Sequence, residues 1–518
     1  MTRIGNSLKN IKYSIVGQSI YLLINFISRM VFVKILGTEY LGLNGLFSNI
    51  LSILSLADLG IGAAIVYSMY KPLAEKNEVK LKALMRLYKQ AYISIGVLIL
   101  VLGTCLTPFL EFFINGIPQI PYINIIYVLY VLNSGLSYFF SYKRSFLIAD
   151  QKKYIESFYH YLFYLLRNIL QIIILLYTKN FLSFLGIQIL STLLENIIIS
   201  RKVNQLYPFL KGKNNTELDS KERNTILKNV KAMVLHKVGS VVVVGTDNLL
   251  ISKFVGIVEV GLYSNYLLII NALNQIYGMI FQSLTASVGN LGVTEKKEKS
   301  IFIFNCIDLF GFWIYAFSSI CLIILFNPFI NIWLGKEYQL QMSIIMLIVI
   351  SFYLTGRRKS VLTFKDALGL FWYDRHKSLY ESGINLFISI ILAKFIGMEG
   401  VLLGTIISTL LTCFWIEPYV LYKYGFRGSV KSYFRKYGFY TTIMIIVGTV
   451  TWIISNLILD YTLLGFLGKL IVCVAIPNSL FLAVFWRTKE FQYLFNIIRP
   501  IIYRLLKSLK IIKHVEVN

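Results

Sequence analysis

The sequence is poor in charged residues, and this shortage narrows the class of protein. Only 15% of its 518 residues are charged, whereas 57% are hydrophobic, and the mean hydropathy is +0.68. A soluble chain of this length would form several domains with polar surfaces, which this composition cannot supply. Runs of about 20 apolar residues recur, each long enough to cross a hydrocarbon core about 30 Å thick. The sequence therefore predicts an all-α polytopic membrane protein.

Residues with metal or redox chemistry are also scarce. The five cysteines lie in apolar runs without metal-ligand spacing, so we expect neither a disulfide framework nor a cysteine metal site. His160, His376 and His514 are scattered and form no metal pattern. No Walker-type glycine loop is present, which argues against ATP hydrolysis. We therefore expect no metal and no cofactor.

Lysine and arginine are distributed unevenly between the breaks that separate the apolar runs. Of the 51 basic residues, 42 fall on one side, in segments such as 70–89, 143–153, 201–231 and 356–378, whereas the opposite loops are short turns such as TKN (178–180) and IGME (396–399). The basic side of a membrane protein is the cytoplasmic side, so both termini are predicted to be cytoplasmic. Topology and anionic lipid headgroups thus explain the net charge of +26, and we expect no nucleic acid. The runs give about fourteen spans, which begin near Tyr13, Leu41, Gln90, Pro118, Tyr154, Phe181, Ala232, Gly261, Ile301, Glu337, Leu379, Gly400, Tyr437 and Leu463.

One short sequence pattern, typical of a turn, occurs twice in the chain. VKILGTEYLGLNG (33–45) and SKFVGIVEVGLYS (252–264) share a lysine, a glycine three residues later and Gly-Leu five residues beyond, and ILSTLL (189–194) recurs as IISTLL (406–411) at nearly the same offset. Six spans separate the copies, so both run in the same direction across the membrane. The pattern predicts two parallel six-helix lobes, with two extra helices at the carboxyl end.

This repeat divides the chain into five predicted parts. They are an N-terminal lobe (1–210), a cytoplasmic linker (211–231), a C-terminal lobe (232–425), two additional helices (426–486) and a cytoplasmic tail (487–518). Apolar and basic residues alternate in the tail at helical spacing, which predicts an amphipathic helix on the inner leaflet. Residues 71–90 are predicted to form a second such helix.

The order of these features resembles a known family. NSLKNIKYSIVGQ, the stretch that continues from RMVFVKILGTEYLGLNG to YKPLAEKN (29–77), and DNLLISKFVGIVEVGLYSNY are similar to the Wzx-type polysaccharide flippases of the multidrug/oligosaccharidyl-lipid/polysaccharide superfamily. The resemblance implies transport of an undecaprenyl-pyrophosphate-linked oligosaccharide from the inner to the outer leaflet of a bacterial cytoplasmic membrane. A polysaccharide polymerase and glycosyltransferases are further expected partners.

Charged residues inside the spans are the candidate functional groups, because each costs about 2.5–3.5 kcal/mol on insertion scales. A pyrophosphate needs cations, and a guanidinium can donate two hydrogen bonds to phosphate oxygens at once. We therefore predict a substrate site from Arg29 and Arg167, with Lys237 and Lys253 as further cations, although lysines near span ends can also extend to the interface. Asp58, Asp247 and Asp308 are candidates for ion coupling or for pairing with the arginines. The other charged residues and histidines of the spans are Glu195 and His236, with Lys34 and Lys394 near the outer span ends.

Two other functions fit a polytopic membrane protein. A cation-coupled multidrug exporter of the same superfamily should have acidic, apolar pockets, whereas this interior carries arginines. A membrane sugar polymerase or acyltransferase needs paired catalytic groups and usually a sizeable outer loop, but the outer loops here are short and nearly lack His, Asp and Glu. The lipid-linked oligosaccharide flippase is the interpretation we carry forward, and it is not an enzyme.

Overall fold

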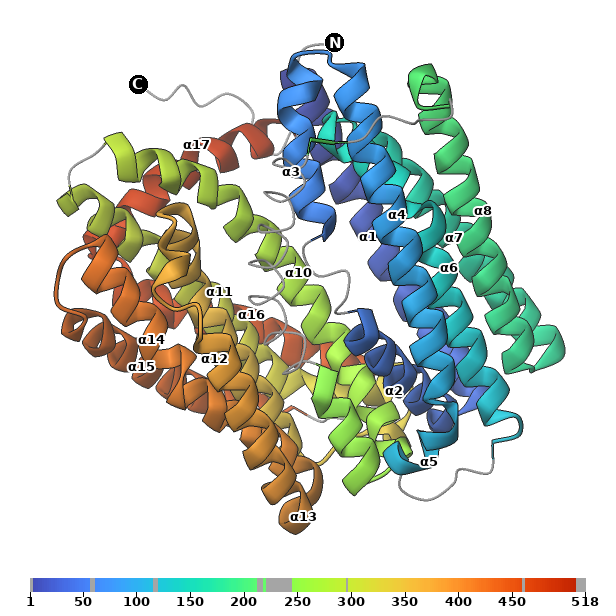
Figure 1. Cartoon of the computed structure of the whole chain (residues 1–518). Helices are drawn as coiled ribbons and strands as arrows, with labels where there is room; N and C mark the ends of the chain where they lie inside the picture. The colour runs from blue at the N-terminus through green and yellow to red at the C-terminus, as the bar shows by residue number, and fades with distance from the viewer. Residues whose placement is uncertain are drawn as a thin grey trace. The chain divides into compact units, whose positions relative to one another are not determined.

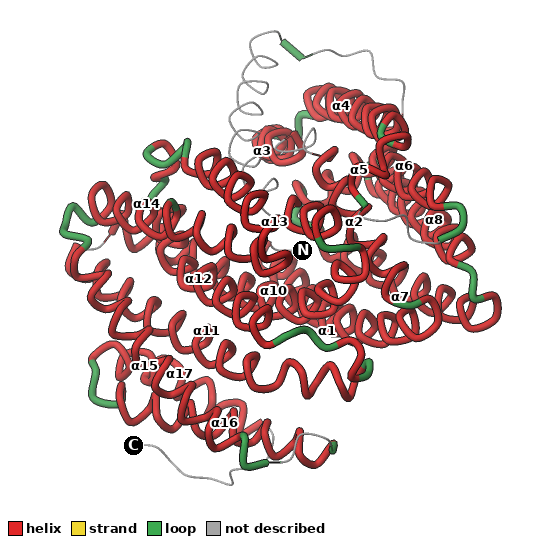
Figure 2. Tube along the Cα trace, turned by 90° about the horizontal axis from the view of Figure 1, so that it is seen from below, coloured by secondary structure: helices red, strands yellow, loops and turns green. Residues whose placement is uncertain are grey.

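The described elements of the chain are all helical. The computed structural model describes residues 3–55, 61–114, 120–211, 218–219, 245–294, 297–458 and 462–508, and none of these lies in a β-strand (Figure 2). Residues 245–254 form an unlabelled helix. The main labelled helices (Figure 1) are α1 (Arg3–Leu36), α2 (Thr38–Leu54), α3 (Ile61–Ala74), α4 (Glu78–Cys105), α5 (Leu110–Phe113), α6 (Ile123–Ala149), α7 (Lys153–Thr178), α8 (Phe181–Leu206), α10 (Ile257–Thr294), α11 (Lys297–Trp333), α12 (Met342–Ala367), α13 (Lys377–Leu411), α14 (Cys413–Val420), α15 (Lys431–Ser455), α16 (Leu463–Phe485) and α17 (Lys489–Ser508).

Ten stretches of the described residues are long and apolar enough to cross a membrane. One of them, Lys377–Gly425, covers two predicted spans, because α13 leaves helical geometry at Ile396 and Gly397, where the IGME turn was expected. Gly397 has φ +59°, a conformation that glycine adopts without a side-chain penalty. The predicted span near Ala232 lies mostly outside the described residues. The chain is thus a multi-pass all-α membrane protein, as the sequence predicted.

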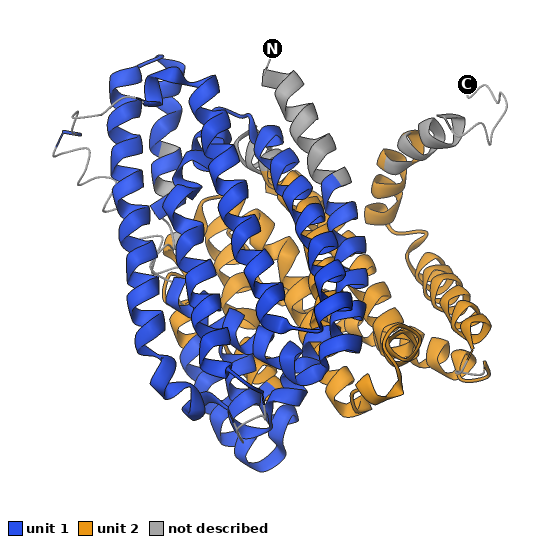
Figure 3. Cartoon of the chain, turned by 90° about the vertical axis from the view of Figure 1, so that its right-hand side faces the viewer, with its two compact units in different colours: residues 1–265, 382–401 blue, residues 266–381, 402–518 orange. Residues whose placement is uncertain are grey.

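Residues 1–265 and 382–401 form one compact unit, here called unit 1 (Figure 3). Within it α6 packs between α4 and α8, and α7 packs against α1 and α8, so that α4, α6, α7 and α8 run side by side (Figure 1). The buried face of α7 carries the polar side chains of Asn168 and Gln171, whereas Ile169 and Leu170 are exposed. This inverted pattern is expected where lipid covers the outer face, because polar groups must then find partners between helices.

Residues 266–381 and 402–518 form the second unit, unit 2. Helix α11 lies at its centre and contacts α12, α15, α16 and α17. The fully buried ring of Phe312 on α11 lies 4.7 Å from Tyr440 on α15 and 5.3 Å from Phe481 on α16, measured between ring centroids. Aromatic side chains bury large surfaces, so this cluster joins three helices tightly.

The basic segments predicted as loops are largely helical. α4 begins at Glu78 and α12 continues to Ala367, so much of 70–89 and 356–378 belongs to long helices that extend past the apolar run. The surface helix expected over 71–90 is therefore wrong, because the turn at residues 75–77 joins α3 directly to α4. The boundaries predicted at residues 210, 231, 425 and 486 stay predictions.

Candidate functional site

Arg29 on α1 lies within unit 1, half-buried. Its Nη1 donates a hydrogen bond of 3.0 Å to Ser264 Oγ, which in turn donates to the carbonyl oxygen of Gly261 at 2.8 Å. Three phenols, those of Tyr164, Tyr130 and Tyr21, lie close enough to act on its charge. Among the described residues Arg29 has no carboxylate within ion-pair distance. Among the described residues, the guanidinium is thus held by neutral groups.

Arg167 on α7 lies beside the same aromatic group. Its Cζ is 4.9 Å from the centre of the Tyr164 ring, and that ring is 4.3 Å from the ring of Tyr21. In the described part of the chain Arg167 forms no ion pair either. The structure therefore places both predicted arginines near one tyrosine, Tyr164, with Arg29 on α1 and Arg167 on α7.

Of the two predicted lysines, the structure describes only Lys253, which lies against a different aromatic side chain. Lys253 Nζ lies 4.6 Å from the centre of the Phe112 ring on α5, and stacks on it as a cation–π contact. Lys237 lies outside the described residues, as does Asp58. Asp247, on the helix of residues 245–254, lies close to the phenol of Tyr263 on α10.

Asp308 has a definite partner in unit 2. Arg357 Nη2 donates to its carboxylate at 3.0 Å, and Arg357 Nη1 donates to its backbone oxygen at 2.8 Å. Arg357 is only 1% exposed, and its Cζ lies 5.3 to 5.7 Å from the ring centres of Phe312, Tyr437 and Tyr440. Asp308 is thus a member of a buried ion pair that joins α11 to α12.

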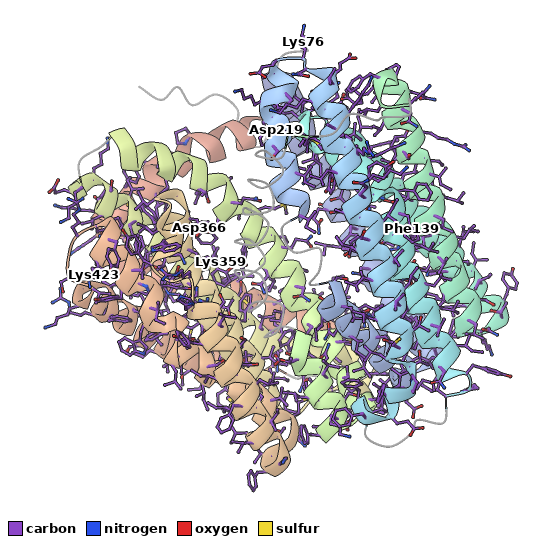
Figure 4. All side chains as sticks on the ribbon, in the orientation of Figure 1. Lys76, Phe139, Asp219, Lys359, Asp366 and Lys423 are labelled. Atoms are coloured by element: carbon purple, nitrogen blue, oxygen red, sulfur yellow. The ribbon has the colours of Figure 1, made fainter. Side chains whose placement is uncertain are left out.

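Arg357 is the residue that sequence reasoning missed, along with its neighbours on α12. Arg357, Arg358 and Lys365 were assigned to a basic loop because positive charge marks the cytoplasmic side, yet all three lie on a helix and form ion pairs. Figure 4 labels two further charged residues of α12, Lys359 and Asp366. The useful signal was the helical spacing of apolar Val361 and Phe364, both fully buried, which continues through the supposed loop.

The repeated turn has a defined structure in both copies. Gly37 with φ +87° and Gly256 with φ +154° each stand directly before a helix, α2 and α10 respectively. Five residues later, Gly42 and Gly261 meet the other copy. A Cβ on Gly42 would lie 1.9 Å from the carbonyl oxygen of Ile257, and one on Gly261 would lie 2.3 Å from that of Thr38.

These contacts are reciprocal, because Thr38 and Ile257 are the first residues of the two helices. The copies therefore cross in backbone contact around a local two-fold axis. We call this contact, formed by residues 38–42 and 257–261, the glycine crossing. It lies one turn along α10 from Ser264, the hydrogen-bond partner of Arg29.

Comparison with known sequences and structures agrees with this architecture. The profile of a family described as "Polysaccharide biosynthesis protein" matches residues 7–285, more than half of the 518 residues. The chain belongs to this polysaccharide biosynthesis protein family. No curated protein matches the chain.

Solved transporters share the fold of this family member. The lipid II flippase MurJ, in an inward closed conformation, has a TM-score of 0.62 at 14% identity, over 92% of this chain and 99% of MurJ. An inward-facing multidrug resistance MATE transporter of the MOP superfamily has a TM-score of 0.60 at 16% identity, over 76% and 91%. The Vibrio cholerae MATE transporter VcmN has a TM-score of 0.56 at 15% identity, over 81% and 97%. The family match thus bears out the predicted resemblance to a polysaccharide family, and these structures show that the chain has the fold of MurJ and the MATE transporters.

Proposed function

We propose that the protein moves undecaprenyl-pyrophosphate-linked oligosaccharide units from the inner to the outer leaflet of a bacterial cytoplasmic membrane, for surface polysaccharide assembly. The observation that carries this proposal is the pair Arg29 and Arg167 around Tyr164, two guanidinium groups without a carboxylate partner in the described structure. Such groups are costly inside a membrane protein unless an anion joins them. A pyrophosphate is an anion that two planar donors can share.

The surroundings of the arginines suit the rest of this substrate. The partly exposed Tyr21 offers a phenol oxygen and a ring face to sugars, and the exposed apolar side chains of α7 suit a polyprenyl chain. Transport would proceed by alternating access of the two repeat lobes around the substrate. Lys237 and Lys253 remain candidates for guiding the anionic headgroup. Membrane lipids, and further a polymerase and glycosyltransferases, are the expected partners, with both termini cytoplasmic.

A cation-coupled multidrug exporter is the second candidate, since two of the structural relatives are MATE transporters. A drug exporter with cationic substrates would need a carboxylate among these side chains. In the described part of unit 1, Arg29 and Arg167 face tyrosines and a serine instead. The positive charge of the group therefore favours an anionic substrate.

The test is export in cells that lack their own gene for this protein. Wild-type protein should restore surface glycan, whereas Arg29→Ala should fail and accumulate lipid-linked oligosaccharide on the cytoplasmic leaflet at normal protein level. Arg29→Lys should be intermediate, because lysine keeps the charge but loses the planar fork. The control is Arg201→Ala, an exposed arginine at the end of α8. Full export by Arg29→Ala, or dye export that Arg29→Ala does not change, would contradict the proposal.

A further inference from the structure

A cluster of charged side chains joins three helices in the first repeat. Arg144, near the end of α6, lies 3.7 Å from Glu156 on α7 and 2.6 Å from Glu195 on α8, measured between nitrogen and oxygen atoms. Asn196 supports the cluster, because its Oδ1 accepts a bond of 2.8 Å from the same Arg144 nitrogen. The guanidinium of Arg144 thus lies between two carboxylates and joins α6 to α7 and α8.

A cluster of the same kind joins three helices in the second repeat. Arg358, on α12, lies 3.6 Å from Glu381 on α13 and 2.7 Å from Glu417 on α14. Its Nε adds a second bond to Glu417, of 2.9 Å. Each cluster thus has a short contact and a long contact, of nearly equal lengths in the two repeats.

The two clusters come from corresponding helices but not from corresponding residues. The match of ILSTLL (189–194) with IISTLL (406–411) would pair Glu195 with Thr412, whereas the carboxylate of the second cluster lies five residues later. The helix breaks at Thr412, and α14 then carries Glu417. The same kind of ion cluster, here called the clamp, thus occurs in both repeats with different residue spacing. This indicates that the contact between the three helices is what has been retained.

The clusters differ in their second cation. In the second repeat Lys377 also bonds to Glu417 and lies 3.5 Å from Asp374, which pairs with Lys365 as well. Three permanent cations, those of Arg358, Lys365 and Lys377, thus balance three carboxylates. In the first repeat this place is taken by His160, whose Nδ1 lies 3.1 Å from Glu195 Oε1.

Charge balance in the first cluster therefore depends on one histidine. Arg144 alone faces two carboxylates, and the cluster becomes neutral only when His160 carries a proton. Histidine is the side chain whose charge ordinarily changes between about pH 5 and 8. The His160 side chain is 42% exposed, whereas that of Glu417 in the other cluster is fully buried.

Among the side chains that the structure describes, these groups from the neighbouring helices lie at this level of α7. Arg144 comes from α6 and Glu195 from α8, and Glu156 lies one turn before His160 on α7 itself. From α1, Gln18 meets Tyr161 and Tyr21 meets Tyr164, and both α1 side chains are uncharged at neutral pH.

We infer that His160 is a proton-binding site, and that proton binding completes the clamp that Lys377 completes permanently in the second repeat. With the proton bound, α6, α7 and α8 are held by two cations on Glu195. Without it, the Glu195–Arg144 contact remains and the cluster carries an excess negative charge. The site rests on the ion pairs alone, and it holds whether or not the proposed substrate is correct.

The test is the thermal unfolding of the purified full chain in detergent at pH 5.5 and pH 8.5. Between pH 5.5 and pH 8.5 the unfolding midpoint of the wild type should fall on the order of 2 °C further than that of the His160 variants. The reason is that only the wild type loses the His160 proton over this range. His160→Lys should lose this extra pH dependence and keep the stability of the low-pH state. Its lysine would place a permanent cation beside Glu195, as Lys377 does beside Glu417 in the second repeat. His160→Gln should also lose the extra pH dependence, since glutamine cannot take up a proton. The other histidines are present in both variants, so their contributions cancel in the difference.

The control is His376→Gln, an exposed histidine directly before α13 that forms no ion pair among the described residues, and it should keep the wild-type pH difference. An unchanged pH difference in His160→Gln would overturn the inference, as would its loss in His376→Gln. This experiment needs no transport, so a negative result for the proposed function leaves it intact.

Discussion

The glycine crossing gives the sharpest structural prediction, for the substitution Gly42→Ala. The added methyl would lie 1.9 Å from the carbonyl oxygen of Ile257, 2.9 Å from its carbonyl carbon and 3.0 Å from its Cγ1. Non-bonded atoms of this kind rest at about 3.5 Å, so α2 and α10 must separate by more than about 1 Å. The obstacle is backbone, so no rotamer change can relieve it.

The expected cost follows from two opposing terms. Forcing an extra methyl into packed structure costs about 1–3 kcal/mol, and the upper end applies where backbone must move. Alanine is favoured over glycine inside a helix by about 1 kcal/mol. We therefore expect a net loss of about 2 kcal/mol for Gly42→Ala and, at a contact of 2.3 Å, a similar loss for Gly261→Ala.

Thermal unfolding in detergent measures this loss, with glycan export measured at matched protein level. Gly186→Ala and Gly278→Ala are the controls, because a Cβ at either position meets nothing within 4 Å. The double variant should lose less than the sum of the single variants, since one separation relieves both contacts. Stability of Gly42→Ala equal to that of Gly186→Ala, with normal export, would refute the crossing.

Two further predictions follow from the ion pair and the topology. Asp308→Asn should lower stability by about 3–5 kcal/mol, because it leaves Arg357 buried without a counter-charge, and adding Arg357→Met should recover part of that loss in the same unfolding assay. Additive losses in the double variant would contradict the pair. Reporter fusions at Asn215 and Glu298 should give cytoplasmic signals, and fusions at Gly116 and Asp460 outside signals, and a cytoplasmic signal at Gly116 would overturn the predicted span count.

The sequence predicted the fold class because hydropathy and charge distribution are strong, chain-wide signals. The repeat was also visible, since Gly37 and Gly256 adopt positive φ and Gly42 and Gly261 allow backbone contact, which few other residues permit. What the turn motif does not reveal is that the two copies touch each other. That contact depends on the packing of α2 against α10.

The ion clusters were beyond sequence reasoning for a different reason. Positive charge predicts which side of the membrane a segment faces, but it does not distinguish a loop from the end of a long helix. Arg144 and Arg358 were therefore counted with the loops, although each lies on a helix and binds two carboxylates. Asp308 was predicted to be a coupling or pairing group, but its partner Arg357 was counted with the same loops.

Reconstituted protein tests the central claim most directly. Liposomes containing the purified chain and a fluorescent undecaprenyl-pyrophosphate-linked sugar would report flipping as loss of protection from a membrane-impermeant quencher. The account predicts rapid loss of protection with wild type and with the exposed-site control Arg201→Ala, and loss no faster than in protein-free liposomes with Arg29→Ala or Arg167→Ala. Equal rates for wild type and Arg29→Ala, or no flipping by folded wild-type protein, would contradict it.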